Sequence, residues 1–202
     1  MLNGQLSADS SISNGVTPQA NLDALAFAQQ VAAASNGSPI YLTGHSLGGE
    51  EAEYVEANAN FTVSGGTAFA APGVPNLSSS DSNTNNFTTY VDYGDVIGNF
   101  VPTGGSHVGN VQFIGNPLDA TNEQILLNDD TGVGTLAADT LGIGDHFLNN
   151  YAKDLGVTLA PTTQNETDLG AADVVDMMNA FGVVPYGGVG QSTQVKTFQQ
   201  FF

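Results

Sequence analysis

The stretch "IYLTGHSLGG", residues 40–49, places one serine between two glycines directly after a short strand-like run. The run predicts a strand over Ile40–Thr43, and "LGGEEAEYVEANAN" after it predicts a helix. A Gly-x-Ser-x-Gly pattern between a strand and a helix is typical of a nucleophile elbow, a strained turn that exposes the serine hydroxyl. Small residues at Gly44 and Gly48 let the flanking backbones pack closely. We therefore expect Ser46 to be a nucleophile, with the Leu47 backbone N–H beside it to stabilise an oxyanion.

The segments around this turn alternate between helical and extended patterns. Thr17 followed by Pro18 starts a helix that the apolar spacing extends to about residue 34. Further predicted elements are an interrupted strand at 61–63 and 66–70, a strand from Asn86, a strand or hairpin in "GNVQFIGNP", a helix over Asp145–Leu155 and a helix in "DLGAADVVDMMNAFG". This alternation predicts an α/β fold with a mostly parallel sheet flanked by helices.

Length and composition limit the function classes. The 202 residues suit one domain, which we divide into a core over 1–160 and a C-terminal helix and Gly/Gln-rich tail over 161–202. The formal charge is −18, with 2 basic residues against 20 acidic ones, so nucleic-acid binding is not expected. No cysteine is present, which excludes disulfides and thiolate chemistry. No segment approaches the roughly 20 apolar residues of a membrane span.

A serine nucleophile needs a base, and the chain has three histidines. His45 adjoins the serine, so its side chain should point away from the hydroxyl. His146 follows the last predicted strand, as the chain order serine, acid, histidine requires, and is the favoured base. His107, in "GGSHVGN", is the alternative.

The base in turn needs a carboxylate to hold its tautomer. Asp95, in "YVDYGDVIGNF", follows a strand on a turn after Gly94 and is the favoured acid. Asp92, at the end of the same strand, is the alternative. Asp81, Asp129 and Asp130 lie in polar loops and are interpreted as solvated turn residues. No metal site is predicted from the Asp129–Asp130 pair.

Five segments together resemble successive blocks of the fungal-type lipase family, often called class 3, in its bacterial branch. They are "PIYLTGHSLGGEEAEYV", "GTAFAAPGVPN", "VDYGDVIGNFVP", "SHVGNVQF" and "DHFLNNY", and they span about residues 39–151 in the family's order. The resemblance implies an α/β-hydrolase fold, no cofactor, and a triad of Ser46, Asp95 and His146. It also implies a structural element, not the base, around His107.

The chain departs from this family near its beginning. Members usually have, before the elbow, a strand that ends in a Gly-Thr-like turn and supplies a second oxyanion donor. Residues 1–38 contain no such block. We therefore expect a sheet that lacks amino-terminal strands, an amino-terminally truncated core, and self-association through the open sheet edge.

These patterns predict a serine carboxylic-ester hydrolase, similar to lipases and esterases, that works through an acyl-enzyme on Ser46. The alternatives are an acyltransferase with the same triad and a non-catalytic, hydrolase-like binding domain. The expected partner is an ester or lipid substrate. The texture of the sequence, poor in charge and rich in Gly, Asn, Thr and Ser, favours a secreted or cell-surface bacterial protein, although no signal peptide is present in this sequence.

Overall fold

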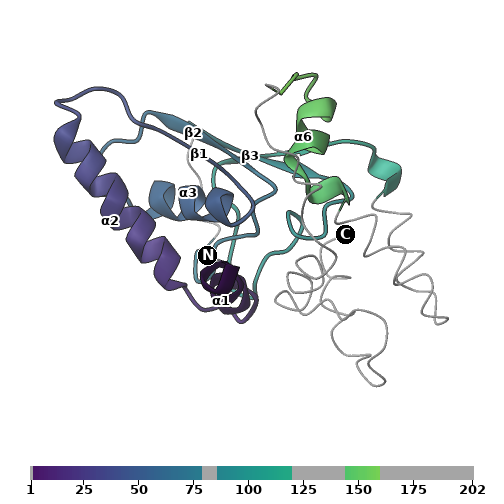
Figure 1. Ribbon diagram of the computed structural model, residues 1–202, viewed down its shortest axis with the longest axis horizontal. Helices are drawn as coiled ribbons and strands as arrows, with labels where there is room; N and C mark the ends of the chain where they lie inside the picture. The colour runs from purple at the N-terminus through teal and green to yellow at the C-terminus, as the bar shows by residue number, and fades with distance from the viewer. Residues whose placement is uncertain (1, 79–85, 120–143, 160–202) are drawn as a thin grey trace.

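The computed structural model describes residues 2–78, 86–119 and 144–159. Within them four strands form one all-parallel sheet in the order β1-β2-β3-β4, flanked by helices (Figure 1). The strands are β1 (Tyr41–His45), β2 (Gly65–Phe69), β3 (Phe87–Asp92) and β4 (Asn110–Ile114). The helices are α1 (Leu2–Ser13), α2 (Gln19–Ala34), α3 (Leu47–Asn58) and α6 (Leu148–Asp154). The predicted α/β class with a parallel sheet is confirmed.

The two faces of the sheet are covered by different helices. Alternate strand residues project to opposite faces. Ala68 and Phe87 pack with Ala52 of α3 in a core cluster, so α3 covers their face. On the other face, the rings of His45 and Phe69 meet the ring of Tyr151 in α6 at centroid distances of 6.4 Å each. Because all four strands are parallel, their carboxyl ends lie at one edge of the sheet.

The predicted elements around the elbow are found, and α1 is an element that the sequence did not predict. Its sequence, "LNGQLSADSSIS", has few apolar residues and no amphipathic pattern. The helix is anchored by Ile12, which is fully buried against Val96, Ile97 and Phe100 from the loop after β3. Tertiary packing, not local propensity, explains this helix.

Two predicted elements differ from the structure. Residues 61–63 are not a strand; β2 begins at Gly65. The predicted helix over Asp145–Leu155 is broken at Phe147, whose extended ψ of 140° makes it the N-cap of α6. This break leaves the His146 carbonyl outside the α6 ladder, where it accepts a hydrogen bond from His45 Nε2 at 2.7 Å.

Several predictions fall outside the described residues. They are the helix in "DLGAADVVDMMNAFG", the Gly/Gln-rich tail, and the loop aspartates Asp81, Asp129 and Asp130. Among the helices of the described ranges, none is both long and apolar enough to cross a membrane. No strand precedes Tyr41 in the described residues, and β1 lies at one edge of the sheet.

Buried carboxyl groups are an unusual feature of α3. Glu53 is fully buried and accepts hydrogen bonds from the Thr89 hydroxyl at 2.7 Å and the Val108 N–H at 3.2 Å. Glu50 is also fully buried, and its Oε1 accepts a hydrogen bond from the Asn21 side-chain amide at 2.7 Å. Glu50 Oε2 and Asn21 Oδ1 have no hydrogen-bond partner among the described residues. Because an ionised carboxylate is an acceptor only, a neutral Glu50 suits this environment better.

Desolvation by burial raises the pKa of Glu50 to about 8. Since this folded-state pKa lies above the ordinary value of 4.5, folding favours the protonated form. The stability tied to Glu50 is highest below pH 4.5 and is lost as the pH rises toward 8.

We predict that Glu50→Gln increases the free energy of unfolding relative to the wild type, and that the difference grows from pH 5 to pH 8. Glutamine keeps the acceptor for Asn21 and cannot ionise. Urea unfolding across this range measures the difference. Glu51→Gln, on the same helix but only partly buried, should change the pH dependence less. An equal stability difference at all pH values would contradict the prediction.

Candidate functional site

Ser46 occupies a sharp turn between β1 and α3. β1 ends at His45 and α3 begins at Leu47, so a single residue joins the strand to the helix. Ser46 has φ 56° and ψ −128°, a backbone conformation that non-glycine residues rarely adopt. The turn is held by hydrogen bonds from Ser46 N–H to the Phe69 carbonyl, 2.9 Å, and from Glu50 N–H to the Ser46 carbonyl, 3.1 Å. Such a strained position persists because its surroundings determine it.

The glycines of the motif have unequal roles. A Cβ at Gly44 would collide with the carbonyl of Gly48, so β1 and the first turn of α3 can approach only because residue 44 has no side chain. A Cβ at Gly48 would meet nothing within 4 Å, so the expectation that Gly48 must itself be small is not supported by its surroundings. Gly49 is the second tight position, because its Cβ would lie 3.0 Å from Ala71 Cβ.

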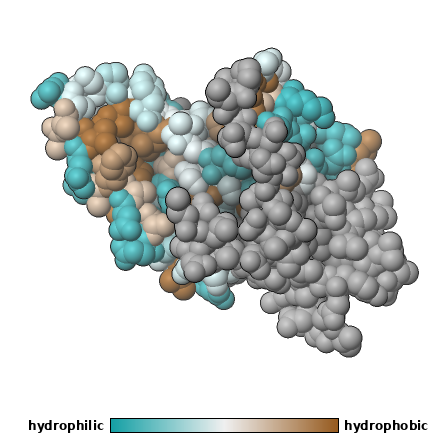
Figure 2. All heavy atoms as spheres, viewed as in Figure 1, coloured by the Kyte–Doolittle hydropathy of each residue, from teal (hydrophilic) through white to brown (hydrophobic). Residues whose placement is uncertain are grey.

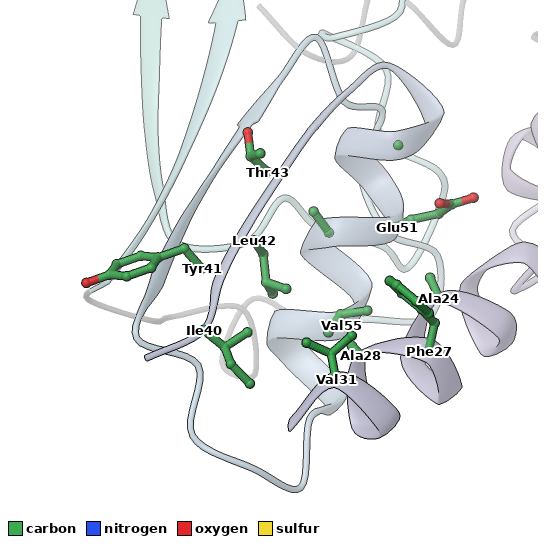
Figure 3. A pocket seen from close by; sticks show the side chains of 12 residues that line it. Ala24, Phe27, Ala28, Val31, Ile40, Tyr41, Leu42, Thr43, Glu51 and Val55 are labelled. Carbon is green, nitrogen blue, oxygen red and sulfur yellow. The ribbon is translucent and has the colours of Figure 1, made fainter. Parts of the chain in front are cut away.

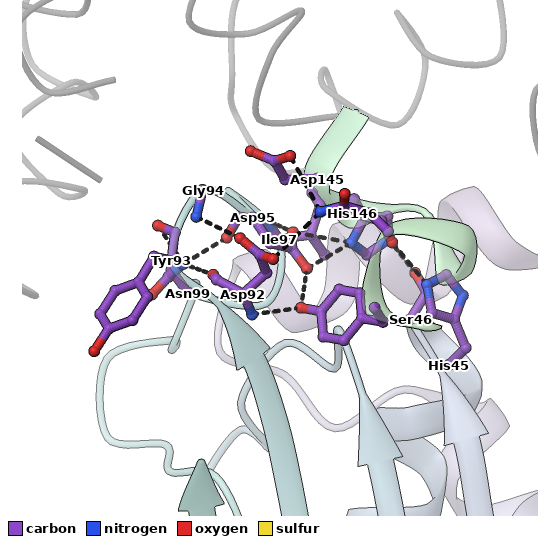
Figure 4. A network of polar contacts seen from close by, with 12 residues as sticks. His45, Ser46, Asp92, Tyr93, Gly94, Asp95, Ile97, Asn99, Asp145 and His146 are labelled. Carbon is purple, nitrogen blue, oxygen red and sulfur yellow. Dashed lines mark hydrogen bonds and ion pairs between the residues drawn. The ribbon is translucent and has the colours of Figure 1, made fainter. Parts of the chain in front are cut away.

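His146 lies next to Ser46 although 100 residues separate them in the chain. The Ser46 hydroxyl is 2.8 Å from His146 Nε2, and His146 Nδ1 is 3.0 Å from Asp95 Oδ1 (Figure 4). His146 is 2% exposed, so water has little access to its ring. With Nδ1 protonated and donating to Asp95, Nε2 is left as the acceptor that faces the serine hydroxyl.

Asp95 is held as a carboxylate by several donors. It is fully buried and accepts hydrogen bonds from the Ile97 N–H at 2.8 Å and the Tyr151 hydroxyl at 2.6 Å. Burial alone would raise its pKa, but the neighbouring His146 and the hydrogen bonds from His146, Tyr151 and Gly98 together hold the pKa of Asp95 below its usual value. Asp95 therefore stays charged and can orient the imidazole.

Tyr151 and His45 support this arrangement, and the sequence did not indicate the role of Tyr151. The Tyr151 hydroxyl donates to Asp95 and accepts from the Asp92 N–H at 2.9 Å, which ties α6 to the end of β3. Burial and the charge of Asp95 raise the pKa of Tyr151 well above its ordinary value, so it remains a donor. His45 points away from the serine, as its place next to Ser46 in the chain predicts, and its Nε2 lies 2.7 Å from the His146 carbonyl oxygen.

The alternative base and acid lie elsewhere. His107 Nδ1 is 3.4 Å from Glu53 Oε1. Asp92 is buried, and its carboxylate accepts from the Gly94 N–H at 2.9 Å and the Asn150 amide at 3.3 Å. Burial and neighbouring acids raise the pKa of Asp92 to about 7. The structure brings Ser46, His146 and Asp95 together and brings neither alternative into the group.

The Leu47 N–H belongs to the first turn of α3, where backbone N–H groups lack intrahelical acceptors. Ile12 of α1 packs in the cluster that contacts the Leu47 side chain, so α1 and not a strand borders this part of the site. α1 also brings Asp9, which is 8% exposed. Burial raises the pKa of Asp9 to about 6, and the charge of His146 lowers it. No sequence pattern pointed to Asp9.

No group of three or more His, Cys, Asp or Glu side chains suited to a metal ion occurs in the described part of the chain. The arrangement that stands out chemically is a serine hydroxyl, an imidazole and a carboxylate in series beside a helix N-terminus. Comparison with known proteins adds no relative: no family model, curated protein or solved structure matches this chain.

Proposed function

We propose that this protein is a serine carboxylic-ester hydrolase, similar to lipases and esterases, with an α/β-hydrolase-like fold. The observation that carries the proposal is the series Ser46 Oγ, His146 Nε2, His146 Nδ1 and Asp95, joined by contacts of 2.8 and 3.0 Å. Its three members come from separate loops at the carboxyl edge of a parallel sheet, where α/β proteins place their functional groups. The backbone of Ser46 adds support, because strain at an exposed nucleophile is typical of an elbow.

The first half of the reaction forms an acyl-enzyme. Ser46 Oγ attacks the ester carbonyl carbon while its proton moves to His146 Nε2. Asp95 stabilises the imidazolium that results, as its depressed pKa allows. The carbonyl oxygen becomes an oxyanion beside the Leu47 N–H and the positive end of the α3 dipole. The tetrahedral intermediate then breaks its bond to the alcohol oxygen, which takes the proton from His146 and leaves as the alcohol.

The second half releases the acid. A water molecule gives its proton to His146 Nε2 and attacks the acyl carbon, and collapse of the second intermediate returns the proton to Ser46 Oγ. Attack by an alcohol in place of water would give the acyltransferase reaction from the same intermediate. A hydrolase-like domain without activity would instead fail to react with an electrophile that traps serine nucleophiles.

A fluorophosphonate probe with peptide mapping tests the proposal most directly. We expect one labelled peptide, which contains Ser46, and hydrolysis of p-nitrophenyl esters in a panel of increasing chain length. Absence of labelling together with absence of ester hydrolysis would favour the non-catalytic binding domain.

Replacement of the nucleophile should abolish activity and spare the fold. Ser46→Ala removes one hydroxyl and no packing, so we predict a fall in kcat of about 10⁴-fold or more. Circular dichroism and the melting temperature should change little. Ser38→Ala, at an exposed serine outside the site, is the matched control and should keep full activity. Substantial residual hydrolysis by Ser46→Ala would remove the elbow from the mechanism.

The different contacts of His146 and His107 predict different results when each is replaced by alanine. His146→Ala should lose nearly as much kcat as Ser46→Ala, because no base then faces the serine. His107→Ala should chiefly lower stability, because buried Glu53 loses a partner. Ester kinetics and thermal unfolding of both variants measure this. An active His146→Ala and an inactive His107→Ala would reverse the assignment.

Tyr151 should act as a positioning residue. Tyr151→Phe removes one of the donors to buried Asp95 and leaves the buried Asp92 N–H without its acceptor, which should cost about 1–3 kcal/mol of stability. Misplacement of the imidazole should lower kcat by up to about 10²-fold. The Tyr151 hydrogen bond lowers the pKa of Asp95. Without this hydrogen bond, the Asp95 carboxylate is more basic and stabilises the protonated imidazole more strongly. The acid limb of the pH–rate profile should therefore move to higher pH.

The matched control for this variant is Tyr90→Phe, at a partly buried tyrosine whose ring stacks on Phe69 on the same face of the sheet. It should leave the pH–rate profile in place. A Tyr151→Phe variant that is less stable but has an unshifted profile would limit Tyr151 to a structural role.

A further inference from the structure

The outer edge of β1 is open among the described residues. β1 pairs only with β2 there. On the β2 side, the Ile40 carbonyl accepts from Ser64 N–H at 2.7 Å and Ser46 N–H donates to Phe69 at 2.9 Å. Backbone groups alternate in direction along a strand, so the N–H and C=O groups of Tyr41 and Thr43 point to the opposite edge. Both residues are exposed, which leaves this edge accessible to another extended segment.

An apolar groove of about 360 Å³ follows this edge, between α2 and α3 (Figure 3). Four consecutive residues, 40–43, line it, so the strand edge itself forms the floor. One wall is a helical stripe of α2 with spacing i, i+3, i+4, i+7, and the other is a stripe of α3. The α2 stripe is Ala24, Phe27, Ala28 and Val31, and the α3 stripe is Gly48, Glu51, Ala52 and Val55.

Apolar side chains around the groove are unusually exposed. Phe27 is 68% exposed and Val31 39%. In the space-filling view, apolar residues gather in a hollowed patch in the region of α2 (Figure 2). A contiguous exposed patch of this kind marks an interaction site more often than isolated surface residues do.

The charge at the groove indicates what would bind there. Glu51 is the one acidic residue of its lining, and burial and then the nearby Asp23 raise its pKa. The whole chain has a formal charge of −18 and only Lys153 and Lys196 as basic residues. A second copy would therefore bring mostly negative charge to a negative site, whereas a segment with lysine or arginine would be complementary.

We infer that β1 and this groove form a docking site for an extended segment of a basic polypeptide partner. The segment adds as a strand to the open edge, with its backbone bonded to Tyr41 and Thr43. Its alternate apolar side chains enter the groove between α2 and α3, and a lysine or arginine pairs with Glu51. This inference does not depend on the proposed hydrolase activity, since Ser46, Asp95 and His146 do not line the groove.

The test uses the whole chain and a labelled ten-residue peptide that alternates valine with threonine and carries lysine at one central valine position, on the face that enters the groove with Glu51. We expect saturable binding by fluorescence polarisation. The same peptide with N-methylated amides should not bind, because it cannot donate to the strand edge. A peptide with glutamate in place of lysine should bind at least about tenfold more weakly.

Variants of the protein locate the site. Val31→Asp places a charge in the groove, and Thr43→Pro removes an outward N–H that the β1–β2 ladder does not use. Each should weaken binding about tenfold or more. Glu51→Gln should weaken it about two- to fivefold. Val157→Asp, at a valine that is 56% exposed and outside the groove, is the matched control and should bind normally. Thermal unfolding confirms that each variant is folded.

Three results would overturn the inference. They are no binding of the lysine peptide to the wild type, equal binding of the N-methylated peptide, and unchanged binding by folded Val31→Asp and Thr43→Pro. Light scattering adds a fourth: a concentration-dependent dimer of the wild type that Val31→Asp abolishes would identify a second copy as the occupant. Ester hydrolysis by Val31→Asp should equal that of the wild type, so the two proposals can fail separately.

Discussion

The contact on which the site depends is the close approach of β1 to the first turn of α3 at Gly44. Only the missing side chain lets the Gly48 carbonyl come this near. Because the strand and the helix lie so close, a single residue, Ser46, connects them. Its backbone adopts a strained conformation to make this connection. The strain is opposed by hydrogen bonds to β2 and within α3. Because β2 and α3 hold the backbone of this turn, the Ser46 hydroxyl has a defined direction.

The second half of the site is built by a break in a helix. Continuous helix through Phe147 would use the His146 carbonyl within the ladder. The break instead leaves that carbonyl to accept a hydrogen bond from His45, so His146 contacts the turn at Ser46 through its backbone as well as its ring. Tyr151, one turn into α6, then reaches back to Asp95. The same short segment thus supplies His146 and holds Asp95, its carboxylate partner.

Acidic residues serve opposite purposes in this protein. Asp95 is buried with enough donors to remain ionised, and its low pKa suits an ion pair with imidazolium. Glu50 is buried with one donor, and its pKa is raised to about 8. The difference follows from the number of donors and the charge around each group, not from depth, since both are fully buried. The excess of acidic residues elsewhere is also the reason that we propose a basic partner for the β1 edge.

The sequence by itself determined the local elements whose signals are short-range. The turn at Ser46, the strand before it, the helix after it and the α2 helix all follow from periodicity and from glycine and proline positions. The chain order serine, aspartate, histidine also singled out Asp95 and His146 as the candidates for a site with Ser46. Their role as a triad stays a prediction, although the structure places them in contact.

Only the tertiary structure decided the rest, because those features depend on residues far apart in the chain. Helix α1 is stabilised by Ile12 in a cluster with residues 96–100, which no local pattern shows. At the break before α6, His45 binds the His146 carbonyl, and Tyr151 binds the Asp92 N–H at the end of β3. Glu53 binds Val108, which lies just before β4. Burial sets the pKa values of Asp9 and Glu50. Sequence patterns report what a residue does to its neighbours in the chain, whereas desolvation and hydrogen bonding across the sheet are set by packing.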